Sequence, residues 1–540
     1  MTMTAMSVRG QLAADPDLGA GNVLTTLVER GFGLDKPTFT FDTEVDGLIP
    51  AWRSLTVAEL DERVRARAAT LHRLGIRRAD PVAVLVTTAA DTVLAFYALA
   101  RLGAIPALVN PRVPAELVAL YLSRLRAEAL IADADRREAL AGHDFGIDTV
   151  IDAETLGASD PADAPVPYRH YADDPVAITH SSGTTGVPKA VVHSHQSLFA
   201  AVKHKLRMPM AHGTERMLNA LPAPHVATLI VINQALTHQT ELLSLSVQAG
   251  PSVVDTIERW QPSSVFGFAT TWADLAKQDL SKRDIGSVSM WFNTGDCAHE
   301  AHIRRLVVLG HRTVATKDGR VRQSGSVFID GLGSSEMGHS HFFITHTKDT
   351  DRYGRCVGRP YSFCDLKVFD PDGNELPNYE VGELGTRSPT NALGYWNNSA
   401  QMFRTRLKGY FLTGDLVYRD DAGYYYHMDR LVDSVDLGDG KRLYTAMSEE
   451  RILAACADVV DCTVSAVRED DKIVTDVLLQ LTPDANPAED RTDRILAALD
   501  SHVAATVRKI EVVDDNAIPV GPTGKVRKFR LRQLQTQEST

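Results

Sequence analysis

The sequence feature that most constrains the fold is a run of small and hydroxyl-bearing residues, Ser-Ser-Gly-Thr-Thr-Gly-Val-Pro-Lys, at positions 181–189. Strand-like apolar segments precede it at 175–179 and follow it at 190–192, a setting that does not suit a flexible linker. Glycines let the backbone approach an anion closely, and hydroxyls and a lysine bind phosphate oxygens. A Walker A loop is excluded, because Pro188 stands directly before Lys189. We predict a phosphate-binding loop formed by Ser181, Ser182, Gly183, Thr184, Thr185, Gly186 and Lys189.

The segments before this loop alternate between strand-like and helix-like patterns. Short apolar runs at 82–86, 107–109 and 129–132 alternate with segments of helical periodicity at 55–75, 91–102 and 114–125. Such alternation is typical of a parallel α/β sheet. After the loop, predicted strands at 216–221, 263–268 and 288–292 each end in a turn of small residues or prolines. Because ligands bind beyond the carboxyl ends of parallel strands, we expect these turns and the loop to share one cleft.

The chain has 540 residues, which is too long for a single core, and its pattern changes along its length. The first fifty residues are expected to form an irregular arm that leads to a strand-like start, and 316–325 suggests an extra hairpin beside the site. From about residue 353, short alternating strands predict a small β-rich subdomain. A Gly/Asp-rich segment at 433–440 is typical of a hinge. The remainder predicts helices at 448–455 and 490–502 and strands at 461–467, 472–480 and 509–513. We predict an N-terminal domain over 1–432 and an α+β lid over 433–540.

Composition narrows the class of protein. A net charge of −12 disfavours a general nucleic-acid binder. Five cysteines without a Cys-x-x-Cys pair favour a reduced protein over a disulfide scaffold or a zinc module. The most apolar stretch, 81–109, is interrupted by Asp91 and Arg101 and predicts core elements instead of a membrane span. Because the N-terminus also lacks a signal-peptide core, we expect a cytoplasmic protein with no nucleic-acid or membrane partner. A homo-oligomer stays an open alternative.

Five further motifs follow the loop in a fixed order. They are Gly333-Ser-Ser-Glu-Met-Gly338, Gly394-Tyr-Trp396, Tyr410-Phe-Leu-Thr-Gly-Asp415, Asp429-Arg430 with Asp433, and Pro519-Val-Gly-Pro-Thr-Gly-Lys525. Together with the loop they resemble the signatures of the adenylate-forming superfamily, which includes acyl-CoA synthetases, firefly luciferases and peptide-synthetase adenylation domains. The resemblance extends from about residue 55 to residue 528. It implies an α/β fold, in which a large N-terminal domain of stacked, mostly parallel sheets with a small β-rich subdomain carries a mobile α+β C-terminal lid.

The resemblance also implies a role for each motif, with ATP and Mg²⁺ as cofactors. Lys525 on the lid is the implied catalytic residue, because a lysine can contact both anions that must meet, the acid and the α-phosphate. Glu336, with Thr184 beside the phosphates, would bind Mg²⁺ as a hard oxygen ligand. Asp415 would accept hydrogen bonds from the ribose hydroxyls, and Arg430 would donate to ribose or phosphate.

Further residues are assigned to the adenine and acid pockets by the same resemblance. The segments that would enclose adenine contain Gly295, Asp296, Gly333, Ser334 and Ser335. His225 resembles the residue that gates the acid pocket and is a candidate catalytic residue, although a single histidine is more often a hydrogen-bonded structural residue. The acid pocket is expected near 266–271, 293–294 and 337–341. Its histidines, which include His339 and His341, favour a small polar or aromatic acid over a long alkyl chain.

The hinge region departs from the family pattern. Where CoA-using members usually carry a lysine, this chain has Asp436, and Thr445 and Met447 stand in place of a proline and a glutamate. CoA therefore stays an open acceptor. The main hypothesis is ATP-dependent adenylation of a small, aromatic carboxylic acid followed by transfer to a thiol, CoA. The alternatives are adenylation with another outcome, either an amine acceptor or nitrite activation as in ATP-dependent diazotases, and an inactive nucleotide-binding regulatory protein.

Overall fold

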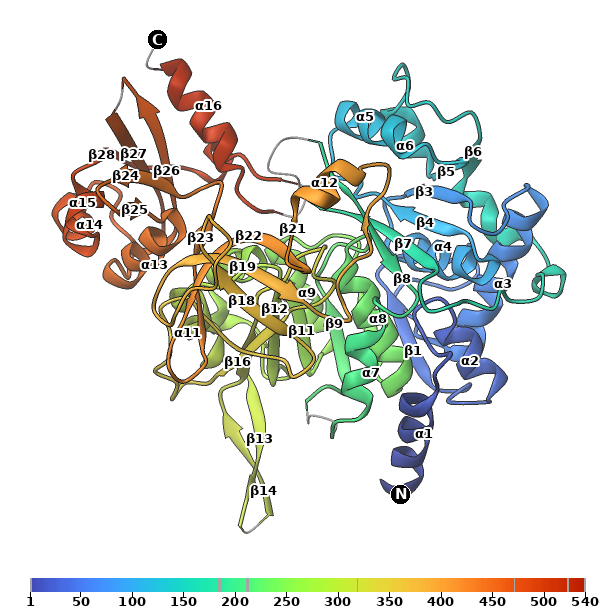
Figure 1. Ribbon diagram of the computed structural model, residues 1–540. Helices are drawn as coiled ribbons and strands as arrows, with labels where there is room; N and C mark the ends of the chain where they lie inside the picture. Colours follow the sequence, from blue (N-terminus) through green and yellow to red (C-terminus); the bar gives the residue numbers. More distant parts are fainter. Residues whose placement is uncertain are drawn as a thin grey trace.

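A computed structural model describes residues 2–181, 187–209, 213–317, 319–470, 472–521 and 524–538 of the chain. A large N-terminal domain of mixed α/β structure carries a smaller C-terminal domain beside its β-rich part (Figure 1). This arrangement confirms the predicted fold class. None of the helices in the described ranges is long and apolar enough to cross a membrane.

The larger sheet has a parallel centre with the strand order β15-β12-β11-β9-β10-β1. Side chains of successive strand residues point to opposite faces, so Met217 and Leu218 of β9 enter different buried clusters. The short strand β2 pairs antiparallel with β1 at the edge. The strands span β1 Pro37–Phe41, β2 Leu55–Thr56, β9 Arg216–Asn219, β10 Glu241–Ser244, β11 Ser264–Phe268, β12 Met290–Thr294 and β15 Val327–Asp330.

The second sheet has the order β20-β8-β7-β4-β3-β5-β6. Its strands β3 to β7 are parallel, and the hairpin β7–β8 adds an antiparallel edge that flanks the glycine-rich run. The strands span β3 Pro81–Leu85, β4 Ile105–Leu108, β5 Ala129–Ala132, β6 Val150–Asp152, β7 Pro175–His180, β8 Ala190–Ser194 and β20 Gly394–Tyr395.

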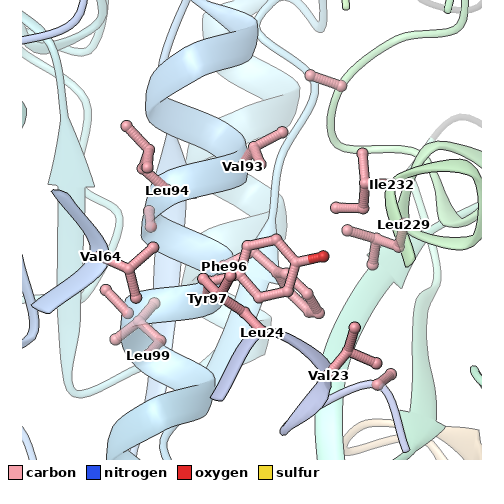
Figure 2. Packing of buried hydrophobic residues seen from close by; sticks show 14 of the residues in the cluster. Val23, Leu24, Val64, Val93, Leu94, Phe96, Tyr97, Leu99, Leu229 and Ile232 are labelled. Carbon is pink, nitrogen blue, oxygen red and sulfur yellow. The ribbon is translucent and has the colours of Figure 1, made fainter. Parts of the chain in front are cut away.

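The main core lies between the two sheets. One buried cluster contains residues of both sheets and of the helices α3, α4 and α8. Figure 2 shows side chains of α4, among them Phe96 and Tyr97, packing towards Leu24 of α2 and Leu229 of α8. Two local signals set the helix ends. Thr56 and Glu59 form a capping box at the start of α3, and Gly103 ends α4 at a positive φ of 72°.

The remaining helices of the large domain cover the outer faces of the sheets or extend from them. Residues of α9, α10 and α11 pack on the larger sheet, and residues of α5 pack on the second sheet. The helices span α1 Thr2–Ala14, α2 Val23–Glu29, α3 Val57–Arg73, α4 Ala89–Leu102, α5 Ala115–Leu125, α6 Ala134–Ala139, α7 Ala200–Leu206, α8 Val226–His238, α9 Gly250–Trp260, α10 Ala269–Ala276, α11 Glu300–Val307 and α12 Ser399–Arg404.

The predicted β-rich subdomain extends the larger sheet through antiparallel strands in the order β15-β16-β17-β23-β22-β19-β18. The strands span β16 Phe342–His346, β17 Cys356–Pro360, β18 Asp365–Phe369, β19 Gly382–Arg387, β21 Arg406–Leu407, β22 Tyr410–Arg419 and β23 Tyr425–Arg430. The predicted extra hairpin is also present. Strands β13 (His311–Thr316) and β14 (Gly319–Ser324) pair antiparallel and project from the body (Figure 1).

The C-terminal domain is built on the sheet β26-β27-β28. Its elements span β24 Val435–Gly438, β25 Lys441–Leu443, α13 Thr445–Ala455, β26 Val459–Glu469, β27 Lys472–Leu481, α14 Thr492–Ala498, α15 Ser501–Ala504, β28 Val507–Val512 and α16 Lys528–Glu538. Its first helix is tied to the large domain, because the buried carboxylate of Asp429 accepts hydrogen bonds from the backbone N–H and the hydroxyl of Thr445. His302 of α11 also bonds the carbonyl of Val460, over 2.8 Å.

Two sequence-based predictions were wrong. The first thirty residues are not an irregular arm, since they contain α1 and α2, and Leu12, Leu18 and Leu27 are buried in the main core; β1 agrees with the strand-like start that was expected to follow. The predicted helix at 490–502 is interrupted at Leu499 and Asp500, where the backbone is extended and Asp500 begins α15. In the first segment tertiary burial of apolar side chains decided the structure, and the local pattern did not reveal it. At the second, Asp500 occupies the N-cap position of α15.

Candidate active site

The carboxyl ends of β9, β11 and β12 lie side by side, as the sequence predicted, and β15, which the sequence did not predict as a strand, lies next to β12. The turns that follow β12 and β15 line one cavity, whereas β11 leads directly into α10. Gly295, after β12, has a φ of 83°, and a Cβ at this position would lie 3.2 Å from the ring of Phe268. A Cβ at Gly333, after β15, would lie 2.9 Å from the Cα of Ser340. Close backbone approach therefore explains both glycines.

The glycine-rich run begins at the end of β7 and returns into β8. The backbone N–H of Ser181 donates to the carbonyl of Lys189 over 3.1 Å, which closes the base of the loop. The Ser335 hydroxyl donates to the carbonyl of His180 over 3.4 Å and so brings the second motif against this base. Within the described residues, the buried hydroxyl oxygen of Ser181 has no hydrogen-bond partner. The predicted residues Ser182, Gly183, Thr184, Thr185 and Gly186 lie outside the described residues.

Glu336 lies beside Tyr395 of β20. The Tyr395 hydroxyl donates to one Glu336 carboxylate oxygen over 3.1 Å, and burial, together with the Glu336 charge, raises the Tyr395 pKa above its ordinary value. The Lys189 ammonium lies 5.5 Å from the centre of the same tyrosine ring. The Glu336 carboxylate is half-buried. One of its oxygens accepts the Tyr395 hydrogen bond, and the other can bind a hard cation such as Mg²⁺. The donor chemistry therefore fits the predicted metal, with Lys189 close to the same site.

Asp415 and Arg430 face each other across the strand pair β22–β23. The Arg430 Nε lies 3.1 Å from one Asp415 oxygen, and His427 Nε2 lies 3.6 Å from the same oxygen. Burial alone would raise the Asp415 pKa, but Arg430 and His427 outweigh it and lower the pKa. Neither nitrogen forms a hydrogen bond of regular geometry within the described residues. Asp415 is therefore an ionised, buried carboxylate, and the two nitrogens beside it can still form hydrogen bonds to a polar ligand.

Lys525 reaches from the C-terminal domain into this site. Its ammonium donates to the carbonyl of Gly295 over 2.8 Å and lies 3.7 Å from a carboxylate oxygen of Asp296. Burial would raise the Asp296 pKa, but Lys525, His427 and Arg355 hold it well below its ordinary value. Arg355, which sequence reasoning missed, is buried and lies 3.6 Å from Asp296. The predicted residues Gly295, Asp296 and Lys525 are therefore in direct contact.

A cavity of about 680 Å³ opens between these turns and the helices α7 and α8. Its lining includes Gly295, Gly333 and Ser334 at the nucleotide-motif end and an aromatic wall of Phe266, Phe292, Phe343 and Tyr361. The Phe266 and Phe292 rings stack at 4.4 Å, and the Phe343 and Tyr361 rings lie 4.7 Å apart. Such a cavity, apolar with few polar groups, suits an aromatic ligand.

His225 lines the cavity at the start of α8. Its Nδ1 accepts a hydrogen bond from the backbone N–H of Ala227 over 3.2 Å, so its Nε2 carries the ring proton. Burial, with a smaller effect from Lys525, lowers the His225 pKa to about 3. A neutral His225 is therefore a hydrogen-bond donor and not a proton acceptor at neutral pH.

Only one of the two histidines after Glu336 lines the cavity. His339 does, whereas His341 is fully buried among protein groups. His341 Nδ1 bonds the hydroxyl of Thr386 over 2.6 Å, and its Nε2 bonds that of Thr390 over 2.9 Å. His341 is thus a structural residue, and the expectation that it faces the ligand was wrong.

Among the described residues, Asp330 at the end of β15 is the one carboxylate in the cavity lining, and it was missed in the sequence. It is buried and accepts hydrogen bonds from Asn293 and the backbone N–H of Gly331. Burial raises its pKa to about 7, although these hydrogen bonds oppose the rise. An isolated aspartate at a strand end gives no sequence signal of such burial.

The raised Asp330 pKa predicts how stability depends on pH. Below about pH 4 this group is protonated in the folded and unfolded states, and as pH rises towards 7 only the unfolded state gains by ionisation. The wild type should therefore lose about 3 kcal/mol of unfolding free energy, relative to Asp330→Asn, between pH 5 and pH 8. Denaturant unfolding of both proteins at the two pH values measures this difference. A difference that does not change with pH would show that Asp330 is ionised throughout.

Comparison with known proteins assigns the chain to a class. The family model of AMP-binding enzymes matches residues 31–396, and the chain belongs to this family. It is an adenylate-forming enzyme, as the motifs predicted. It is 40% identical over 546 residues to the 3-aminoavenalumate diazotase of a Streptomyces species, with 97% of each chain covered. The feruloyl-CoA synthase of an Amycolatopsis species is 26% identical, with 89% of this chain and 94% of that protein covered.

Solved structures agree on the fold. The anthranilate CoA ligase AuaEII in complex with anthranoyl-AMP matches with a TM-score of 0.82 at 21% identity, covering 96% of this chain and 98% of that one. At this identity the likeness concerns the fold and leaves the acceptor open.

Proposed function

We propose that this enzyme is an ATP-dependent diazotase, which adenylates nitrite and transfers its nitrogen to an aromatic amine. The observation that carries the proposal is the 40% identity, over 97% of both chains, to a protein named as a diazotase. The printed name of that relative's substrate denotes an amino-substituted carboxylate. The departures at Asp436, Thr445 and Met447 support the same choice, because they fall where CoA-using members resemble one another.

The proposed chemistry has two steps. A nitrite oxygen attacks the α-phosphorus of ATP, and pyrophosphate leaves with the electrons of the broken bond. The amine nitrogen then attacks the nitrogen of the mixed anhydride, and AMP leaves while the amine loses a proton. The resulting N-nitroso group takes up a proton and loses water to give the diazonium ion. The first attack brings two anions together, and in the second step negative charge develops on the AMP that leaves, so cationic groups at the α-phosphate lower both barriers.

Each described site residue has a place in this proposal. Lys525 contacts nitrite and the α-phosphate, and Ser181 and Lys189 bind the β- and γ-phosphates together with the loop. Glu336 holds Mg²⁺, which would supply neutralising positive charge at the phosphates. Asp415 and Arg430 bind the ribose, and the turns with Gly295, Asp296, Gly333, Ser334 and Ser335 enclose the adenine. The neutral His225 donates a hydrogen bond from its Nε2–H to the nitrite.

The cavity favours an aromatic amine as its occupant. A volume of about 680 Å³ is far larger than nitrite requires, and its walls are aromatic. Asp436, in the hairpin β24–β25, is exposed and adds negative charge where CoA-using members place a lysine. We also propose that residues 433–540 move as a lid about Asp433, which Arg532 holds in an ion pair at 3.1 Å.

Nitrite-dependent turnover tests the proposed function. With ATP, Mg²⁺, nitrite and an aminoaryl acid, we expect one AMP and one pyrophosphate per diazonium ion, which is trapped as a coloured azo product with a naphthylamine. Omission of nitrite or of the amine should remove the azo product. Incubation of nitrite and amine without enzyme at neutral pH is the control for spontaneous reaction. Absence of nitrite-dependent AMP formation would overturn the diazotase proposal.

The second candidate is a CoA ligase for an aryl acid, which the feruloyl-CoA synthase relative supports. The same assay distinguishes this candidate from the diazotase when, in a parallel series, CoA and an aryl acid replace nitrite and the amine. AMP formation that requires CoA and not nitrite would establish this candidate. No nucleotide turnover in either series would support the inactive nucleotide-binding alternative.

A further inference from the structure

The cavity extends along α8 to a lysine that the proposed chemistry does not use. Lys205 of α7 lines the cavity, and its ammonium donates to the side-chain oxygen of Gln234 over 3.0 Å. Gln234 stands nine residues after His225 on α8, which corresponds to about 13 Å along the helix axis. His225 contacts the ring of Phe268, which lies against Gly295 at the nucleotide end. Lys205 therefore lies at the opposite end of the cavity.

No carboxylate neutralises Lys205 in the described part of the chain. An ion pair with Lys205 would need an Asp or Glu side chain. Among the described lining residues the one carboxylate is Asp330, which lies at the other end and accepts hydrogen bonds from Asn293 and Gly331. Residues 210–212, which follow α7 and lie outside the described residues, are Met-Ala-His and contain no acid. Gln234 occupies one of the three N–H donors of the ammonium, which leaves two for a ligand.

The groups around Lys205 do not supply the missing negative charge. Burial lowers the pKa of His204, His238 and His339, in the case of His238 to about 4, and it raises the pKa of Tyr361 to about 12. All four are therefore neutral near pH 7. Arg9 of α1 is an additional cation behind α7, where it donates to the backbone carbonyl of Lys205 over 3.0 Å. This end of the cavity is positively charged.

We propose that Lys205 binds the carboxylate of an aminoaryl acid whose amino group points towards the nucleotide end of the cavity. This inference rests on the proposed diazotase function, and it sets the substrate class and its orientation. An aryl acid bound for adenylation would place its carboxylate at Lys525 instead. The rings of Phe343 and Tyr361, which both line the cavity, would pack against the ring of this acid. Burial lowers the Lys205 pKa to about 8, so a carboxylate that restores its charge should bind best below that pH.

Matched ligands and variants test the proposal. The ligands are 3-aminobenzoate, its counterpart with a two-carbon spacer before the carboxylate, and the methyl ester of each. Calorimetry without nitrite measures their binding to the enzyme with a non-hydrolysable ATP analogue, so the result does not depend on turnover. The variants are Lys205→Met, Lys205→Arg and, as a control, Lys203→Met, whose lysine donates to the carbonyl of Asp15 and does not line the cavity.

We expect wild type and Lys203→Met to bind the better of the two acids about 10- to 100-fold more tightly than its ester. Lys205→Met should reduce this ratio to near one, and Lys205→Arg should restore most of it. The ratio should also fall as pH rises through about 8 in the wild type. An unchanged ratio in Lys205→Met would overturn the inference while leaving diazotase activity intact. If the ratio of acid to ester affinity depends on Lys205 but the enzyme shows no nitrite turnover, the diazotase proposal is overturned instead.

Discussion

Replacing Lys525 with alanine is expected to lower nitrite-dependent pyrophosphate release by about 10²- to 10³-fold. The Lys525 ammonium already lies in the site, where it donates to the Gly295 carbonyl and lies 3.7 Å from Asp296. In the reaction it would neutralise charge that develops as nitrite approaches the α-phosphate. Since this charge is greatest in the transition state, the rate should fall much more than the affinity for ATP, which calorimetry should find within about 3-fold of wild type.

The control for this variant is Lys472→Ala, which removes an exposed lysine from the same domain. It should keep the wild-type rate. Comparable losses in both variants would indicate damage to the lid and not loss of a catalytic group. A Lys525→Ala enzyme that keeps more than about a tenth of the wild-type rate would rule out the assigned role.

The second large effect is expected for Glu336→Gln, which should lower the rate about 100-fold and raise the Mg²⁺ concentration for half-maximal rate. Glutamine keeps an oxygen that can accept the hydrogen bond of Tyr395, so the substitution removes mainly the negative charge. Pyrophosphate release measured across a Mg²⁺ titration separates the two effects.

Tyr395→Phe is the matched variant, because it removes the orienting hydrogen bond and keeps the charge. The loss of one such bond should cost about 5- to 10-fold in rate. Equal effects of the two substitutions would mean that Glu336 positions Tyr395 and does not bind the metal.

The sequence was sufficient to predict the fold and the site where the local pattern and the order of the motifs agree. The strand ends at Asn219, Phe268 and Thr294 lie together because parallel strands were recognised, and Asp415 and Arg430, which the motifs assigned to one ligand, face each other in the structure. Whether the lid begins at 433 stays a prediction, as do the roles given to the site residues. The contribution of the first fifty residues to the core could not be predicted, since it depends on distant elements that bury Leu12 and Leu18.

The residues of the candidate site that were missed share one property. Arg355, His427, Asp330 and Lys205 lie outside the recognised motifs, and each contacts a partner on another element of the fold. Arg355, for example, reaches Asp296 from 59 positions along the chain. The sequence alone does not tell a buried charged residue from an exposed one, and only the buried one indicates a site. Such a residue is therefore identified only when its surroundings are known.

The end of strand β23 has a consequence for recombining domains among relatives. Adjacent residues of a strand point to opposite faces, so Asp429 bonds Thr445 of the C-terminal domain while Arg430 pairs with Asp415. Any junction between residues 430 and 444 divides the Asp429–Thr445 contact between two parents. A donated C-terminal half with a hydroxyl at position 445 keeps both hydrogen bonds to Asp429, whereas one with a proline there loses both. The choice of parent at that one position matters more than where the crossover itself falls.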